Sequence, residues 1–168
     1  MGEFSKQHRK QAGSGGSGLK IAVVEDEQKE RRQLCLIVEA YFREKDISLQ
    51  IHPFESGEEI AKRAGEFFDV IFMDIDMGGL DGMEAARRIR AVDSNAVIVF
   101  ITNMAGYAIE GYSVQALDFL IKPVSALRIR QELDKILEIR RRGKPPKIML
   151  KGNGTIFQVD VNDITVFW

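Results

Sequence analysis

The sequence alternates five times between a short apolar run and a longer segment with helical periodicity. Short apolar runs without polar alternation are typical of parallel strands that are buried on both faces. The expected strands are 20–24, 47–54, 67–73, 96–102 and 117–121, and the expected helices are 27–44, 57–64, 83–92, 105–112 and 125–139. This alternation predicts an α/β domain with a doubly wound parallel sheet of five strands in the order 2-1-3-4-5.

Several residues refine this flavodoxin-like prediction. Ser56 and Ser125 each precede a helical pattern and are expected to be N-caps. Pro53 places the end of the second strand at an edge or a turn, because proline cannot donate a ladder hydrogen bond. The fourth helix is expected to be weak because it contains Gly106 and Gly111.

Charged and hydroxyl side chains follow four of the five predicted strands. Glu25 and Asp26 follow the first strand, Asp74 follows the third, Thr102 ends the fourth, and Lys122 follows the fifth. Right-handed crossovers bring the carboxyl ends of these strands to one edge of the sheet. Three carboxylates close together favour a cation such as Mg²⁺, and an aspartate can form an acyl phosphate. The residue types therefore predict phosphoryl transfer onto Asp74, with Lys122 and Thr102 stabilising the transferred group.

The ordered motifs IAVVEDE, FDVIFMDIDMGGLDGME, IVFIT and LDFLIKP resemble the receiver domain of two-component response regulators. This resemblance implies a Mg²⁺-dependent phosphoacceptor, Asp74, that takes its phosphoryl group from a sensor histidine kinase. It implies further Mg²⁺ ligands in the acidic pair Glu25 and Asp26, of which Asp26 ligates directly, and in the backbone carbonyl of Asp76. It also implies that Phe119 is the aromatic switch residue. The family commonly has proline where Gly78 stands, and this departure removes no ligand.

The segment 107–119 narrows the resemblance to receivers that control LytR/AlgR-type (LytTR) DNA-binding domains. The resemblance implies transcription control through homodimerisation on the face of the fourth helix, fifth strand and fifth helix. Residues 147–151 and 155–159 alternate around a Gly-Asn-Gly turn, which predicts a hairpin, and 164–168 form a third apolar run. The expected organisation is an artificial leader with a Gly/Ser linker (1–18), a receiver domain (19–140), a linker (141–146) and the first part of a truncated LytTR domain (147–168). DNA binding is expected only of the full-length protein.

Composition excludes few classes of protein. The net charge of −1 gives no whole-chain argument for nucleic-acid or membrane binding, and the single cysteine, Cys35, fits a reducing compartment such as the cytoplasm. Two alternatives to the phosphorylated switch remain open. The first is a haloacid-dehalogenase-like phosphatase, although its acidic pair would come late in the chain; the second is a binding module that is never phosphorylated. The expected activity is not that of an enzyme, beyond self-catalysed phosphotransfer and dephosphorylation.

Overall fold

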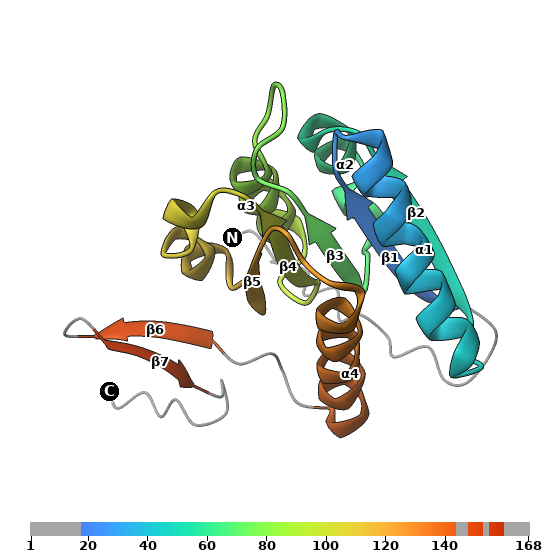
Figure 1. Cartoon of the computed structure of the whole chain (residues 1–168). Coiled ribbons are helices and arrows are strands. Elements are labelled where there is room, and N and C mark those ends of the chain that lie inside the picture. Colours follow the sequence, from blue (N-terminus) through green and yellow to red (C-terminus); the bar gives the residue numbers. More distant parts are fainter. Residues whose placement is uncertain (1–17, 144–147, 153–154, 160–168) are drawn as a thin grey trace, which may run out of the picture.

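A parallel sheet of five strands forms the centre of the molecule (Figure 1). The computed structural model describes residues 18–143, 148–152 and 155–159. The strands are β1 (Leu19–Val24), β2 (Leu49–Phe54), β3 (Val70–Met73), β4 (Val97–Thr102) and β5 (Asp118–Ile121). Their order is β2-β1-β3-β4-β5 with every pair parallel, which confirms the predicted topology.

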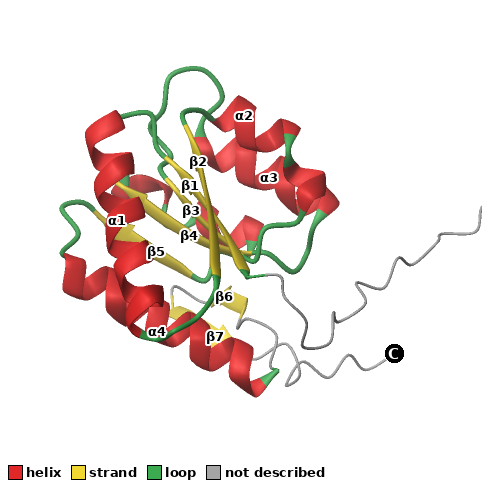
Figure 2. Cartoon of the chain, turned by 90° about the vertical axis from the view of Figure 1, so that its right-hand side faces the viewer, coloured by secondary structure: helices red, strands yellow, loops and turns green. Residues whose placement is uncertain are grey.

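Helices cover both faces of the sheet (Figure 2). Helices α1 (Gln28–Glu44) and α4 (Ala126–Arg142) pack on one face. The other face carries α2 (Gly57–Lys62), α3 (Gly82–Val92) and the short 3₁₀ helices η1 (Ala64–Glu66), η2 (Ala105–Tyr107) and η3 (Glu110–Val114). Each face therefore has its own apolar core, and all residues of β3 and β4 are buried between the two.

Side-chain caps begin three of the helices. Ser56 Oγ accepts a hydrogen bond from the amide of Glu59 at 3.2 Å, and Ser125 Oγ accepts one from Arg128 at 3.1 Å, which confirms both expected N-caps. Asp81 provides the same interaction at the start of α3, where its Oδ1 lies 2.8 Å from the amide nitrogen of Glu84.

The expected fourth helix at 105–112 is wrong in its type. The chain forms the two 3₁₀ helices η2 and η3 there instead of one α-helix. Two glycines within this segment lower its helix propensity. Gly111 is buried, and a Cβ added to it would lie 3.5 Å from the Phe119 ring. The segment ends at Gln115, whose left-handed backbone (φ 53°) stops further helix formation.

Pro53 lies in β2, which is an edge strand of the sheet, so the expectation for this proline is confirmed. The expected hairpin also forms, with β6 (Ile148–Gly152) antiparallel to β7 (Thr155–Val159) and Gly152 opposite Thr155. Residues 1–17 of the expected leader (1–18) and the apolar run at 164–168 lie outside the described residues. Among the residues that are described, no helix combines the length and the hydrophobicity needed to cross a lipid bilayer.

Candidate phosphoacceptor site

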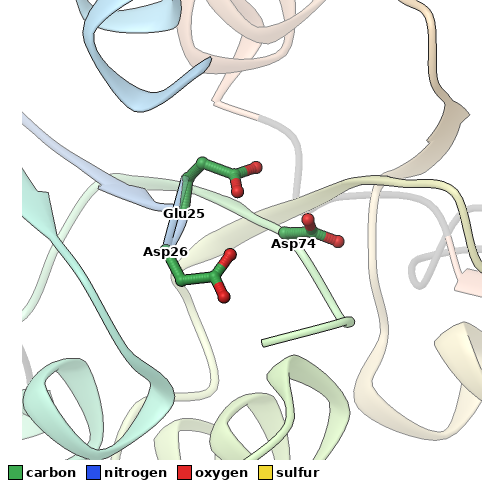
Figure 3. A group of neighbouring side chains, drawn as sticks. All are labelled: Glu25, Asp26 and Asp74. Atoms are coloured by element: carbon green, nitrogen blue, oxygen red, sulfur yellow. The ribbon is translucent and has the colours of Figure 1, made fainter. Parts of the chain in front are cut away.

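Three carboxylates meet where β1 and β3 end. Val24 pairs with Met73 in the sheet, so Glu25, Asp26 and Asp74 leave adjacent strands at the same level. The amide of Asp74 donates to the carbonyl of Val24 at 2.9 Å, which continues the sheet pairing into the site. Figure 3 shows the three side chains extending to the same side of these strand ends, and one oxygen from each lies within 4.8 Å of the others. Because like charges at this range repel, a nearby positive charge stabilises such a cluster.

Lys122 supplies one positive charge to this cluster. It follows β5, and its Nζ lies 2.9 Å from Asp74 Oδ2 and 2.7 Å from Glu25 Oε2. Nζ also donates to Glu30 Oε2, a residue in the first turn of α1. The lysine side chain is 14% exposed. Burial alone lowers its pKa, but hydrogen bonds to the three carboxylates leave that pKa above its ordinary value. Lys122 is therefore charged at any physiological pH.

Glu25 is the most strongly perturbed acid of the site. Burial raises the pKa of its carboxyl to about 7, against the opposing effects of hydrogen bonds from Lys122 and from the Glu27 amide. The negative charge of Asp74 raises this pKa further. A cation near this carboxyl would favour its ionised form and so lower its pKa.

Thr102 lies on β4, between the strands that lead to Asp74 and Lys122, and Phe119 lies on β5. Thr102 is the last residue of β4 and is fully buried, and its Oγ1 accepts a hydrogen bond from the amide of Met104 at 3.2 Å. Its carbonyl accepts from the amide of Lys122 at 3.0 Å, which links the two residues through the sheet. Phe119 is half-buried on β5, with its ring centroid 5.7 Å from that of Phe100.

The loop between β3 and α3 keeps close to Asp74. The amide of the exposed Asp76 donates to Asp74 Oδ1 at 3.1 Å, and the amide of Gly82 donates to the carbonyl of Ile75 at 3.0 Å. A Cβ on Gly82 would lie 2.0 Å from the backbone oxygen of Asp74, so only glycine allows this approach. Gly78, where the family commonly has proline, is exposed, and a Cβ added to it would have no neighbouring atom within 4 Å.

Sequence reasoning missed two residues that hold this site together. Glu30 contacts Lys122, and Arg31 is almost buried, with its guanidinium donating to the carbonyl of Glu25 at 2.8 Å. Both precede the apolar residue Leu34 by about one helical turn, so they continue the stripe of α1 that faces the sheet. That spacing was the available signal.

An open groove of about 410 Å³ begins at the site and continues between α1 and the segment after β5. Its polar end contains Glu25, Glu30, Asp74 and Lys122. Its apolar wall is formed by side chains of α1, β4, the β5–α4 connection and α4, namely Leu34, Ile37, Ile101, Val124 and Ile129. Asp74 is 5% exposed and is one of the residues that line this groove.

The geometry agrees with the comparison to known proteins. A family model described as the response regulator receiver domain matches residues 21–134. The chain belongs to this family. The solved response regulatory domain of MrkE from Klebsiella pneumoniae is 28% identical and superposes with a TM-score of 0.65, covering 73% of this chain and 98% of that domain.

Two further proteins are similar to this chain. The sensory transduction protein LytT from Oceanobacillus iheyensis is 29% identical over 87% of this chain, which confirms the expected subfamily. The match covers 61% of that LytT protein's length. The response regulator TrrA from Thermotoga maritima, solved in complex with Mg²⁺ and BeF, is 25% identical with a TM-score of 0.59, covering 69% of this chain and 96% of the other.

Proposed function

We propose that this receiver domain accepts a phosphoryl group on Asp74 from a sensor histidine kinase and acts as a phosphorylation-controlled switch. The observation that carries the proposal is the contact of Lys122 Nζ with Asp74 Oδ2 at 2.9 Å, within a cluster that also contains Glu25 and Asp26. Four residues from three separate strand ends converge there. Neither a solvated helix start nor a simple turn would require such a convergence.

The transfer is a displacement at phosphorus. A carboxylate oxygen of Asp74 forms a bond to the phosphorus of a phosphohistidine, while the bond between phosphorus and the imidazole nitrogen breaks. The histidine leaves with the electron pair of that bond and takes up a proton. Lys122 stabilises the negative charge on the phosphoryl oxygens, and Thr102 is the hydroxyl that would hydrogen-bond one of them. In the later hydrolysis, water would attack the phosphorus of the acyl phosphate and the bond between phosphorus and the Asp74 oxygen would break. The products would be free Asp74 and inorganic phosphate.

The acidic cluster fits Mg²⁺. Carboxylate and carbonyl oxygens are the ligands this ion prefers, and it usually retains several waters. Asp26 and Asp74 would hold the ion directly, with the backbone carbonyl of Asp76 as a further ligand and Glu25 beside them. When bound, Mg²⁺ would offset part of the negative charge of the three carboxylates and of the phosphoryl group.

Thr102 and Phe119 would transmit the conformational effect of phosphorylation to the surface of the domain. The phosphoryl group changes the local charge by about two units. Thr102 would move toward it, and Phe119 would follow into the space that Thr102 vacates. The face formed by η2, η3, β5 and α4 would then repack and form a homodimer. In the full-length protein this dimer would control transcription through a LytTR output domain that begins with β6 and β7.

Beryllofluoride with Mg²⁺ and acetyl phosphate test the proposal directly. We expect both reagents to alter the amide NMR spectrum of the wild-type chain around residues 74–76 and 102–104, with acetyl phosphate also producing a phosphorylated band on a phosphate-affinity gel. Asp74→Asn should abolish both responses while remaining folded. A wild-type chain that is insensitive to both reagents would favour a binding module, whereas catalytic turnover of 4-nitrophenyl phosphate would favour a phosphatase.

A further inference from the structure

Lys122 has no free donor in this structure. An ammonium group carries three N–H donors, and Lys122 directs them to Asp74, Glu25 and Glu30. The three acceptors differ in exposure: the side chains of Asp74 and Glu25 are 5% and 8% exposed, whereas that of Glu30 is 48% exposed.

Phosphorylation changes what Lys122 must bind. The incoming phosphoryl group brings oxygen acceptors to the place where Lys122 meets Asp74, so one existing acceptor has to give up its N–H. Loss of the hydrogen bond from Lys122 costs the least free energy at Glu30, because water can solvate this exposed carboxylate but not the two buried ones. The Glu30–Lys122 ion pair therefore competes with the interaction between Lys122 and the phosphoryl group.

Glu30 also stands on the approach to Asp74. It borders the groove next to Gln33 and Leu34, at the junction between the acidic site and the apolar wall. A small phosphodonor entering there is an anion, and it meets an exposed carboxylate before it reaches Lys122. The same residue therefore acts on the anion twice, by occupying the lysine and by repelling the reactant.

We infer that Glu30 is a positioning residue that holds Lys122 in the unphosphorylated state and weakens the binding of anionic phosphodonors at Asp74. This inference rests on the proposed function. Phosphoryl binding breaks the Glu30–Lys122 ion pair, and the rate and affinity of phosphorylation depend on how firmly that pair is held.

The experiment measures beryllofluoride affinity and acetyl phosphate kinetics, both with Mg²⁺, for wild type, Glu30→Gln and Glu44→Gln. Glu44 is a matched control because it is an exposed carboxylate at the other end of α1 that pairs with Arg130 instead of with Lys122. Glu30→Gln should lower the half-saturating concentration of both reagents by about two- to fivefold, the change expected for loss of one exposed ion pair. The maximal phosphorylation rate should change less than the half-saturating concentration, and Glu44→Gln should match wild type.

A double-mutant cycle in a Lys122→Gln background separates action through the lysine from a general charge effect. The benefit of Glu30→Gln should shrink or disappear in that background, and urea unfolding should show that both Glu30 forms are equally folded. Three results would overturn the inference: no change in Glu30→Gln, weaker binding in Glu30→Gln, or equal gains in Glu30→Gln and Glu44→Gln. A wild-type chain that binds no beryllofluoride would instead reject the proposed function itself.

Discussion

Gly82 is the residue at which the backbone around Asp74 leaves least space for a side chain. A Cβ at this position would lie 2.0 Å from the Asp74 oxygen and 2.9 Å from its carbonyl carbon, and backbone atoms cannot rotate away. We expect Gly82→Ala to lower the free energy of unfolding by about 1–3 kcal/mol, as overpacking does, and to weaken beryllofluoride binding by displacing Asp74. Urea unfolding and titration of the same samples measure both effects.

Gly78→Ala is the control in the same loop. A Cβ there would meet no atom within 4 Å, and Gly78 is absent from the positive-φ residues of the described chain. Its unfolding free energy should stay within about 0.5 kcal/mol of wild type. If both variants lost the same stability, glycine would be needed for the flexibility of the loop and not for the close approach at Gly82.

His52 should make the stability of the domain depend on pH. Its Nε2 is buried and has no hydrogen-bond partner among the described residues, and its ring packs edge-on against Phe68 with centroids 5.4 Å apart. Burial, followed by the charges of Lys20 and Arg63, lowers the pKa of His52 below 6.5, although Glu66 acts in the opposite direction. The unfolded chain therefore binds a proton more readily than the folded chain. Stability from neutral His52 is complete above its unfolded pKa and is lost as the pH falls below it.

Comparison with His52→Leu isolates this contribution. As the pH falls from about 7.5 to about 5.5, wild type should lose more unfolding free energy than the variant, because only wild type protonates at this position. Urea unfolding at several pH values gives the difference, and taking the difference removes the contribution of Glu25, which titrates in both proteins. Parallel pH profiles would show that protonated His52 is accommodated without cost.

Arg90 of helix α3 binds the backbone at the end of η3. The Arg90 guanidinium donates to the carbonyls of Val114, Gln115 and Asp93 at 2.7, 3.1 and 3.3 Å. The first two of these carbonyls lie at the end of η3, where the chain turns into β5, so loss of the arginine leaves them unsatisfied. Arg90→Ala should cost about 1–3 kcal/mol and accelerate amide exchange across residues 110–117.

Arg88→Ala on the same helix provides the comparison. Arg88 is exposed and pairs with Glu84 at 3.4 Å, a contact worth little in water. Arg88→Ala should leave both the free energy of unfolding and the amide exchange of η3 unchanged. Equal exchange in the two variants would mean that packing of Gly111 and Val114, and not Arg90, holds this segment in place.

For the whole molecule, the proposed dimer gives a prediction about association. Ile109, between η2 and η3, is 56% exposed on the face that should repack, and Leu36 on α1 is 58% exposed on the opposite layer. With Mg²⁺ and beryllofluoride, wild type should dimerise in sedimentation velocity. Ile109→Lys should weaken this dimer by about tenfold, roughly 1.4 kcal/mol, while Leu36→Lys should dimerise normally. The reverse pattern would place the interface on α1.

Most of the fold follows from local sequence patterns. Five apolar runs separated by helical segments specify parallel strands and helices, and right-handed connections then limit the strand order, so the predicted sheet was confirmed. The segment 105–112 was predicted wrongly because an apolar helical pattern competes there with two glycines and with packing against Phe119. A pattern of residue types does not show which of these effects prevails.

The sequence alone predicted that Glu25, Asp26 and Lys122 lie near Asp74, because the carboxyl ends of the strands of one parallel sheet meet at one edge. Only the tertiary structure decided how they are paired. Glu30 and Lys122 are 92 positions apart, and their contact depends on the angle at which α1 packs over the sheet. The approach of Gly82 to Asp74 likewise depends on the course of a whole loop. Such contacts arise from the packing of complete elements, for which a local pattern gives neighbours but no distances.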